Sequence, residues 1–211
     1  MAKKIDEPAA PSSKRRNRQL EMQQAALEIF ARKGYDAASI QDVADAIGVL
    51  KGSVYHYISS KEDLLFTIFD DAHHESVALM EQVTALDMSA EEKLQFYLER
   101  SIQTTLENIE RTTLYLRDWR SLTGDRLETV IGQRREYDVF LRRLINEAYE
   151  SLGVEPTMSV KYASSFVSGG ANWVADWYRT GGPDSADKVA KSYAQLAIAA
   201  IMGVATPSPQ R

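Results

Sequence analysis

Apolar residues recur every three to four positions along most of the 211-residue chain, and no stretch sustains the two-residue alternation of a half-buried strand. In the first run the apolar residues recur at helical spacing, and Gly34 follows, a residue that tolerates the left-handed conformation common at helix ends. The apolar residues of this run are Leu20, Ala25, Ala26, Leu27, Ile29 and Phe30. The pattern predicts an all-α fold of nine helices. Their approximate bounds are 16–34, 40–48, 51–57, 61–83, 91–107, 112–122, 126–153, 158–178 and 184–202.

The second and third predicted helices are short and close together. Ser39 precedes the apolar run that opens with Ile40, and Asp42 follows three positions after Ser39, as in a capping box. Gly48 ends this helix, and the next begins at about Lys51. Two short helices joined by a glycine-containing turn are typical of a helix-turn-helix motif. We therefore expect a flexible arm over 1–13, a DNA-binding domain over 14–60, and a helical body over 61–211.

Composition and charge narrow the class of protein. The chain is 44% hydrophobic, which is enough for a packed core, and it has no cysteine for a disulfide, a thiolate metal site or a thiol nucleophile. No signal peptide or membrane span is evident, so a soluble cytoplasmic protein is expected. The net charge of -5 falls entirely on residues 71–211, and in residues 1–70 acids and bases balance. An acidic body with a locally basic head is compatible with DNA binding.

The segment KGSVYHY has the residue types that a DNA-reading helix needs. Lys51 offers a phosphate or guanine contact, Gly52 permits close approach, and Ser53 can donate a hydrogen bond. Tyr55, His56 and Tyr57 can reach the backbone or a base edge, and Lys61 begins the next helix where it could hold another phosphate. The alternative, without a role in DNA binding, is a short solvated helix on the surface. For Tyr55 a place in the core is the stronger interpretation, since it shares a face with neither Lys51 nor His56.

Residues 16–70 resemble the TetR/AcrR family of bacterial transcription regulators, through "IFARKGYDAASI", "VADAIGV", "KGSVYHY" and "SKEDLL". The resemblance implies a three-helix DNA-binding head on a helical body that forms a homodimer through its last two helices. It also implies that a bound effector releases operator DNA. Two departures stand out: Leu50 where the family most often has Ser or Thr, and Ile58 where it most often has Phe. The expected DNA-binding residues are Arg16, Ser39, Lys51, Gly52, Ser53, Tyr55, His56, Tyr57 and Lys61.

The predicted body combines aromatic residues with arginines. The run "YLRDWRSLTGDRLETVIGQRREYDVFLRRLI" resembles regulators of fatty-acid and steroid breakdown that respond to acyl-CoA thioesters, and arginines beside apolar walls suit such an anionic, amphipathic ligand. Arginines paired with neighbouring acids are the alternative. Trp173 and Trp177 share a helix face and fit a core, a pocket or a subunit interface. The expected effector-binding residues are Trp119, Arg120, Arg134, Tyr137, Phe166, Asn172, Trp173 and Trp177.

A helical enzyme, or a helical metal- or ligand-binding protein, that does not bind DNA is the rival class. Its best support is Asp70, His73 and His74, because Asp70 and His74 lie four residues apart and could share a metal ion. No glycine-rich phosphate loop, nucleophile elbow or Cys/His dyad is present. We therefore expect no catalytic residue, no metal and no cofactor.

Overall fold

The computed structural model describes residues 13–207, and it divides into two compact units, Met1–Thr67 and Ile68–Arg211. The predicted arm over 1–13 lies almost entirely outside the described residues. The division falls within a single helix, α4 (Lys61–Ala85), so one continuous helix belongs to both units. Among the described residues, no helix has both the length and the apolar character needed to cross a membrane.

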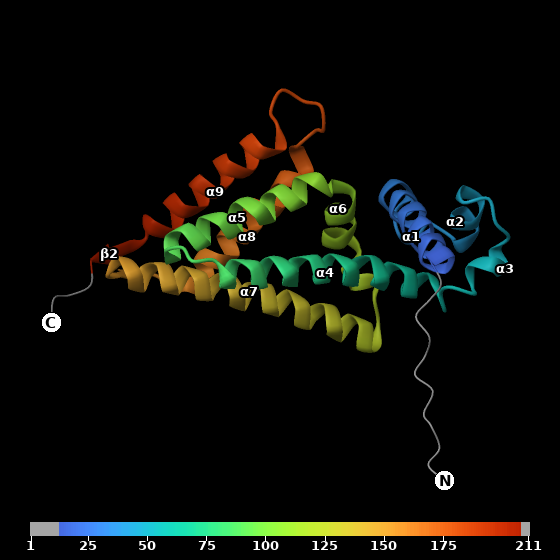
Figure 1. Cartoon of the computed structure of the whole chain (residues 1–211), viewed down its shortest axis with the longest axis horizontal. Helices are drawn as coiled ribbons and strands as arrows, with labels where there is room; N and C mark the ends of the chain where they lie inside the picture. Colours follow the sequence, from blue (N-terminus) through green and yellow to red (C-terminus); the bar gives the residue numbers. More distant parts are fainter. Residues whose placement is uncertain (1–12, 208–211) are drawn as a thin grey trace, which may run out of the picture. The chain divides into compact units, whose positions relative to one another are not determined.

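Unit 1 contains three helices and the start of α4 (Figure 1). They are α1 (Ser13–Lys33), α2 (Ile40–Ala46) and α3 (Lys51–Val54). Gly34 has φ 85° and ends α1, as its position after the apolar run predicted. The side chains of Phe30, Val43 and Val54 are fully buried, which holds the three helices around one small core.

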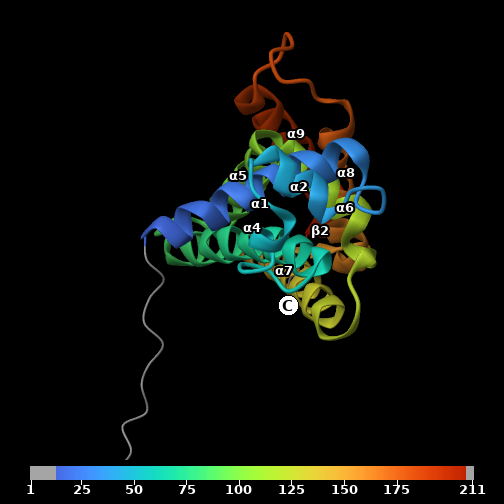
Figure 2. The same ribbon diagram turned by 90° about the vertical axis from the view of Figure 1, so that its right-hand side faces the viewer.

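Unit 2 is a bundle in which α5 (Ala90–Glu107) packs on α7 (Gly124–Leu152), α8 (Val160–Trp177) and α9 (Ala186–Met202). The short α6 (Ile109–Asp118) and the 3₁₀ helix η1 (Trp119–Ser121) connect α5 to α7. Figures 1 and 2 show α5 beside α9 from two directions. The predicted all-α fold with nine helices is confirmed for the described residues.

Three local features differ from the predicted pattern. The third helix is only four residues long, and residues 55–57 continue it as a turn. The sixth begins at Ile109, and its predicted end has become η1. Two short strands, β1 (Val154–Pro156) and β2 (Ala205–Pro207), form an antiparallel pair that ties the end of α7 to the end of α9. Pairs of three-residue strands have too few positions to show an alternation.

The core of unit 2 is centred on one face of α7. Phe140, Leu141, Leu144, Ile145 and Ala148 recur at helical spacing and are all buried. The buried Tyr149 hydroxyl donates to the Ile201 carbonyl at 2.7 Å, which fixes the end of α9 to this core.

Leu144→Ala should lower the free energy of unfolding by about 2–5 kcal/mol, because it leaves a cavity at a side chain that is 1% exposed. The matched control is Val139→Ala on the same helix, where the side chain is 55% exposed, and its effect should stay within about 0.5 kcal/mol. Urea unfolding followed by circular dichroism measures both. Equal effects of the two changes would show that the α7 face does not form the core.

Candidate functional site

The reading segment over 51–57 presents most of its polar side chains to solvent. Val54 and Ile58 are buried, and the Tyr57 and Ile58 amides both donate to the Val54 carbonyl, at 2.9 and 3.3 Å. This anchoring leaves Lys51, Gly52 and His56 exposed and Ser53 and Tyr57 partly exposed. The core interpretation of Tyr55 is wrong, because its side chain is 48% exposed.

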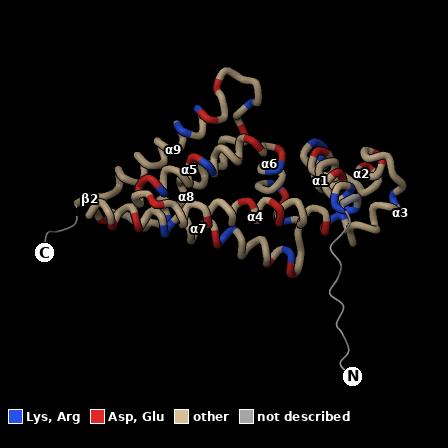
Figure 3. The backbone as a smooth tube through the Cα atoms, in the orientation of Figure 1, with Lys and Arg blue, Asp and Glu red and all other residues tan. Residues whose placement is uncertain are grey.

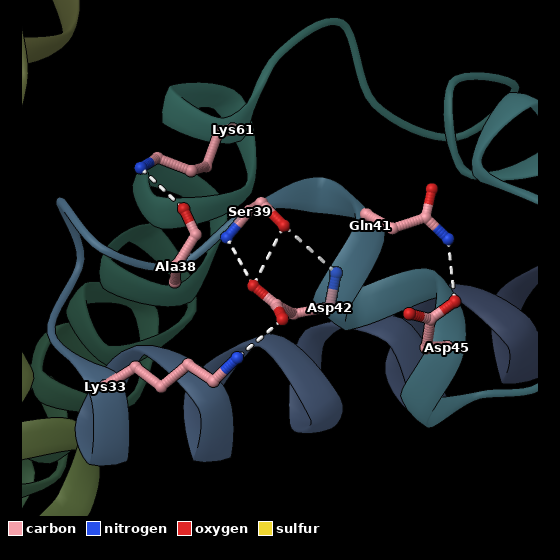
Figure 4. A network of polar contacts seen from close by, with 7 residues as sticks. All are labelled: Lys33, Ala38, Ser39, Gln41, Asp42, Asp45 and Lys61. Carbon is pink, nitrogen blue, oxygen red and sulfur yellow. Dashed lines mark hydrogen bonds and ion pairs between the residues drawn. The ribbon is translucent and has the colours of Figure 1, made fainter.

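Lys61 is placed differently from the expected phosphate ligand. Its ammonium donates to the carbonyls of Tyr35 at 2.7 Å and Ala38 at 3.0 Å, and it lies 4.1 Å from the centre of the Tyr35 ring. Figure 4 shows this side chain reaching from α4 to the connection between α1 and α2. In this arrangement Lys61 holds that connection in place from within unit 1.

Ser39 is occupied by the cap of α2. Its hydroxyl accepts from the Asp42 amide at 3.2 Å, and the Asp42 carboxylate accepts from the Ser39 amide at 2.8 Å, so the predicted capping box is confirmed (Figure 4). Lys33 donates to the same carboxylate at 2.5 Å. The hydrogen bonds from Lys33 and then Ser39 lower the pKa of Asp42 to about 2.

The basic residues at the start of α1 are exposed. Figure 3 shows the blue segment there, and the side chains of Arg15 and Arg16 are open to solvent. Arg18 pairs with Glu21 at 2.7 Å, three residues along the same helix. Arg16 is therefore accessible to a phosphate, while Arg18 is partly neutralised.

Unit 2 contains a partly open cavity of about 910 Å³. Its walls come from α4, α5, α6, α7 and α8. They are mixed in character: apolar residues such as Phe69, Leu98 and Leu141 lie beside polar ones such as Ser76, Thr112 and Asn172. Such a lining suits a ligand with both apolar and polar parts.

Two arginines in the cavity wall differ in how their charge is balanced. Arg111 forms a two-pronged ion pair with Glu75, one arm of which measures 2.8 Å. Arg134 is half-buried, and no carboxylate in the described part of the chain lies within ion-pair distance of it. Its guanidinium instead lies 4.7 Å from the centre of the Trp119 ring and 5.5 Å from that of Tyr115. The cavity wall therefore carries a positive charge that is stacked on aromatic rings but unpaired.

Two tyrosine hydroxyls also line the cavity. The hydroxyl of Tyr115 is buried and makes no hydrogen bond of standard geometry with the residues described here, but the Arg134 guanidinium lies near it and partly offsets the effect of burial on its pKa. The hydroxyl of Tyr137 lies 2.7 Å from His73 Nδ1. Burial raises the pKa of both tyrosines, so both stay protonated and can donate a hydrogen bond. Neither Tyr115 nor His73 was among the effector-binding residues expected from the sequence, where His73 was considered only as a metal ligand. His73 lies four residues from both Phe69 and Val77, and a polar residue within an apolar stripe was the available signal.

The other expected effector-binding residues are scattered. Arg134, Tyr137 and Asn172 line the cavity. Trp119 and Arg120 do not line it, and they stack on each other, with 4.2 Å between the Arg120 guanidinium and the centre of the Trp119 ring. Phe166, Trp173 and Trp177 do not line the cavity. They are 72%, 61% and 38% exposed, so the core interpretation of the two tryptophans is wrong.

The residues of the metal-site alternative have other partners. His73 bonds Tyr137, and His74 Nδ1 lies 2.8 Å from the Asp70 carbonyl. Within residues 13–207 no group of three or more His, Cys, Asp or Glu side chains is arranged to hold a metal ion.

An exposed reading segment on a helix-turn-helix, joined to a body with a ligand-sized cavity, defines a DNA-binding transcription regulator. Comparison with known protein families gives the same class of protein. Residues 24–68 match the model described as "Bacterial regulatory proteins, tetR family", and residues 87–201 match "Tetracyclin repressor-like, C-terminal domain". The chain belongs to the TetR family.

Individual relatives are moderately similar over nearly full length. The transcriptional repressor KstR2 of Mycolicibacterium smegmatis is 27% identical over 93% of this chain and 94% of its own. The crystal structure of the TetR-family regulator PfmR from Thermus thermophilus has a TM-score of 0.76 at 29% identity, covering 84% of this chain and 96% of its own. The structure of AibR with isovaleryl coenzyme A and operator DNA has a TM-score of 0.76 at 20% identity, covering 85% and 97%.

Asp42→Asn should lower the free energy of unfolding, because it weakens the bonds from Lys33 and Ser39. A carboxyl group with a lowered pKa stabilises the fold above its unfolded pKa of about 3.9, and that contribution is lost as the pH falls toward 2. The difference between variant and parent in urea midpoint should thus be constant from neutral pH to about pH 4 and narrow below it. Asp45→Asn, on the same helix, removes a carboxylate charge but keeps an oxygen that can accept from Gln41, and it is the control. A pH-independent difference would contradict the assigned role.

Proposed function

We propose that this chain is a ligand-responsive repressor, which binds operator DNA through the reading segment and releases it when an anionic, amphipathic effector occupies the cavity. The observation that carries the proposal is Arg134, an unpaired guanidinium in the wall of the cavity. A half-buried cation without a carboxylate has lost part of its hydration, which the rings of Trp119 and Tyr115 replace only in part, and an anionic ligand would supply the missing interaction.

An acyl-CoA thioester is the effector class we favour. It combines an apolar acyl chain with anionic groups, and the cavity of about 910 Å³ lies at the upper end of the usual range for ligand pockets, roughly 300–1,000 Å³. Arg134 would bind an anionic group, and the Tyr115 hydroxyl would donate to a carbonyl or phosphate oxygen. The AibR structure, which holds isovaleryl coenzyme A, supports the class, as does the resemblance of the sequence over 115–145.

We also propose that two copies associate through α8 and α9. Tyr162, Phe166 and Trp173 form an exposed apolar stripe on α8, and Leu196 on α9 is 65% exposed. Gly170 lies within this stripe with open space around it, so a partner helix could approach closely. A dimer would present two reading segments to the two halves of an operator.

In this proposal Lys51 and Arg16 neutralise phosphates, while Ser53, Tyr55, His56 and Tyr57 contact the backbone or base edges. Gly52 allows the segment to approach closely. Ser39 and Lys61 act by holding α2 and the connection before it, since their polar atoms already have partners within unit 1.

Lys51→Ala should weaken operator binding. It should also reduce the slope of log Kd against log salt concentration by the amount expected for about one phosphate contact per subunit. The cause is the loss of one charge that displaces a counterion. Lys93→Ala, in unit 2, is the control for loss of a lysine. Fluorescence anisotropy at several salt concentrations measures both variants. Unchanged affinity and salt dependence for Lys51→Ala would show that Lys51 does not contact DNA.

Arg134→Gln should reduce the thermal stabilisation produced by a panel of acyl-CoA thioesters, with affinity falling about tenfold or more, because a charge-assisted hydrogen bond is lost. The neighbouring Arg135→Gln is the matched control, since Arg135 is exposed and does not line the cavity. Differential scanning fluorimetry measures the shift. If no thioester stabilises the parent protein, the proposed effector class fails.

A further inference from the structure

Leu50 is the most exposed large apolar side chain among the described residues, at 81%. It immediately precedes Lys51 and occupies the N-cap position of α3. A leucine cannot cap a helix, and its side chain indeed makes no cap hydrogen bond. The side chain therefore contributes neither packing nor a cap to the folded head, and it is available for contact with another molecule.

The backbone at Leu50 is nevertheless fixed. Its carbonyl accepts from the Ser53 amide at 2.8 Å, and φ and ψ are -73° and 143°. The buried Val54 holds the same turn against the core of unit 1. Leu50 is thus presented at a defined place, next to the exposed Lys51 and Gly52.

Recognition helices of this motif place their N-terminal residues at base edges in the major groove. The apolar group that the base edges offer there is the C5-methyl of thymine. From the proposed operator binding through α3, we infer that Leu50 contacts a thymine methyl in each half-site and thereby selects thymine at that position. The adjacent Lys51 favours a nucleic acid over an apolar protein partner, because its charge would have to be buried in an apolar interface but is balanced by phosphates on DNA.

The contact can be tested by removing its two partners in turn, the thymine methyl from the DNA and the Leu50 side chain from the protein. Operator duplexes are first selected from a random pool with the full-length protein and mapped by footprinting. Each thymine of a half-site is then replaced by uracil, which lacks the methyl but keeps the same hydrogen-bonding groups. Dissociation constants are measured for the parent protein and for Leu50→Ala on every duplex. Leu152→Ala, which shortens a half-exposed leucine in unit 2, is the matched control.

For the parent protein, uracil at one position should weaken binding about fourfold, the worth of one buried methyl. Leu50→Ala should bind the thymine operator less tightly than the parent does. At that one position, replacing thymine by uracil should no longer weaken the binding of Leu50→Ala. Leu50→Met, which keeps an apolar side chain, should retain it, and Leu152→Ala should behave as the parent. Equal uracil effects in the parent and Leu50→Ala at every position, or no uracil effect in the parent, would overturn the contact while leaving operator binding intact. A pool from which no sequence is enriched would overturn both the operator binding and the contact.

Discussion

A single helix, α4, has to serve two cores, and this constraint governs the rest of the structure. Leu64 and Leu65 are buried before the division between the units, and Phe69, Met80 and Val83 are buried after it. The same helix contributes His73 and Ser76 to the cavity wall. At its first turn, Lys61 binds the carbonyls that connect α1 to α2. The cavity-lining residues of α4 and the Lys61 anchor therefore belong to one continuous helix.

In the proposed function, α4 responds to a ligand through the cavity wall. The Tyr137 hydroxyl joins α7 to His73 on α4, while Arg134 on α7 has no charged partner in the described residues. An anion bound at Arg134 adds its contacts to α7 beside this bond. A ligand shifts a conformational equilibrium only by its difference in affinity between the two states. Contacts shared by α4 and α7 are the place where such a difference would arise.

Helical periodicity and capping residues were enough to predict the fold, because each amphipathic helix carries its own signal. The capping box at Ser39 and the helix end at Gly34 followed from local chemistry. The cavity was harder, since a helix wheel shows that Arg134, Trp119 and Trp173 can each face inward but not which of them does. Tyr55 was misplaced in the core, and the core alternative for Trp173 was wrong, for the same reason: burial depends on tertiary neighbours. The β1–β2 pair was missed because three residues carry no usable pattern.

The central claim is that the cavity and the operator are coupled. The most direct test is the dissociation constant of the selected operator, measured with and without a saturating acyl-CoA that stabilises the protein, together with the affinity for that acyl-CoA with and without operator. The account predicts that the ligand weakens operator binding and that the operator weakens ligand binding by the same factor. Ligand and operator binding that are independent of each other would contradict it.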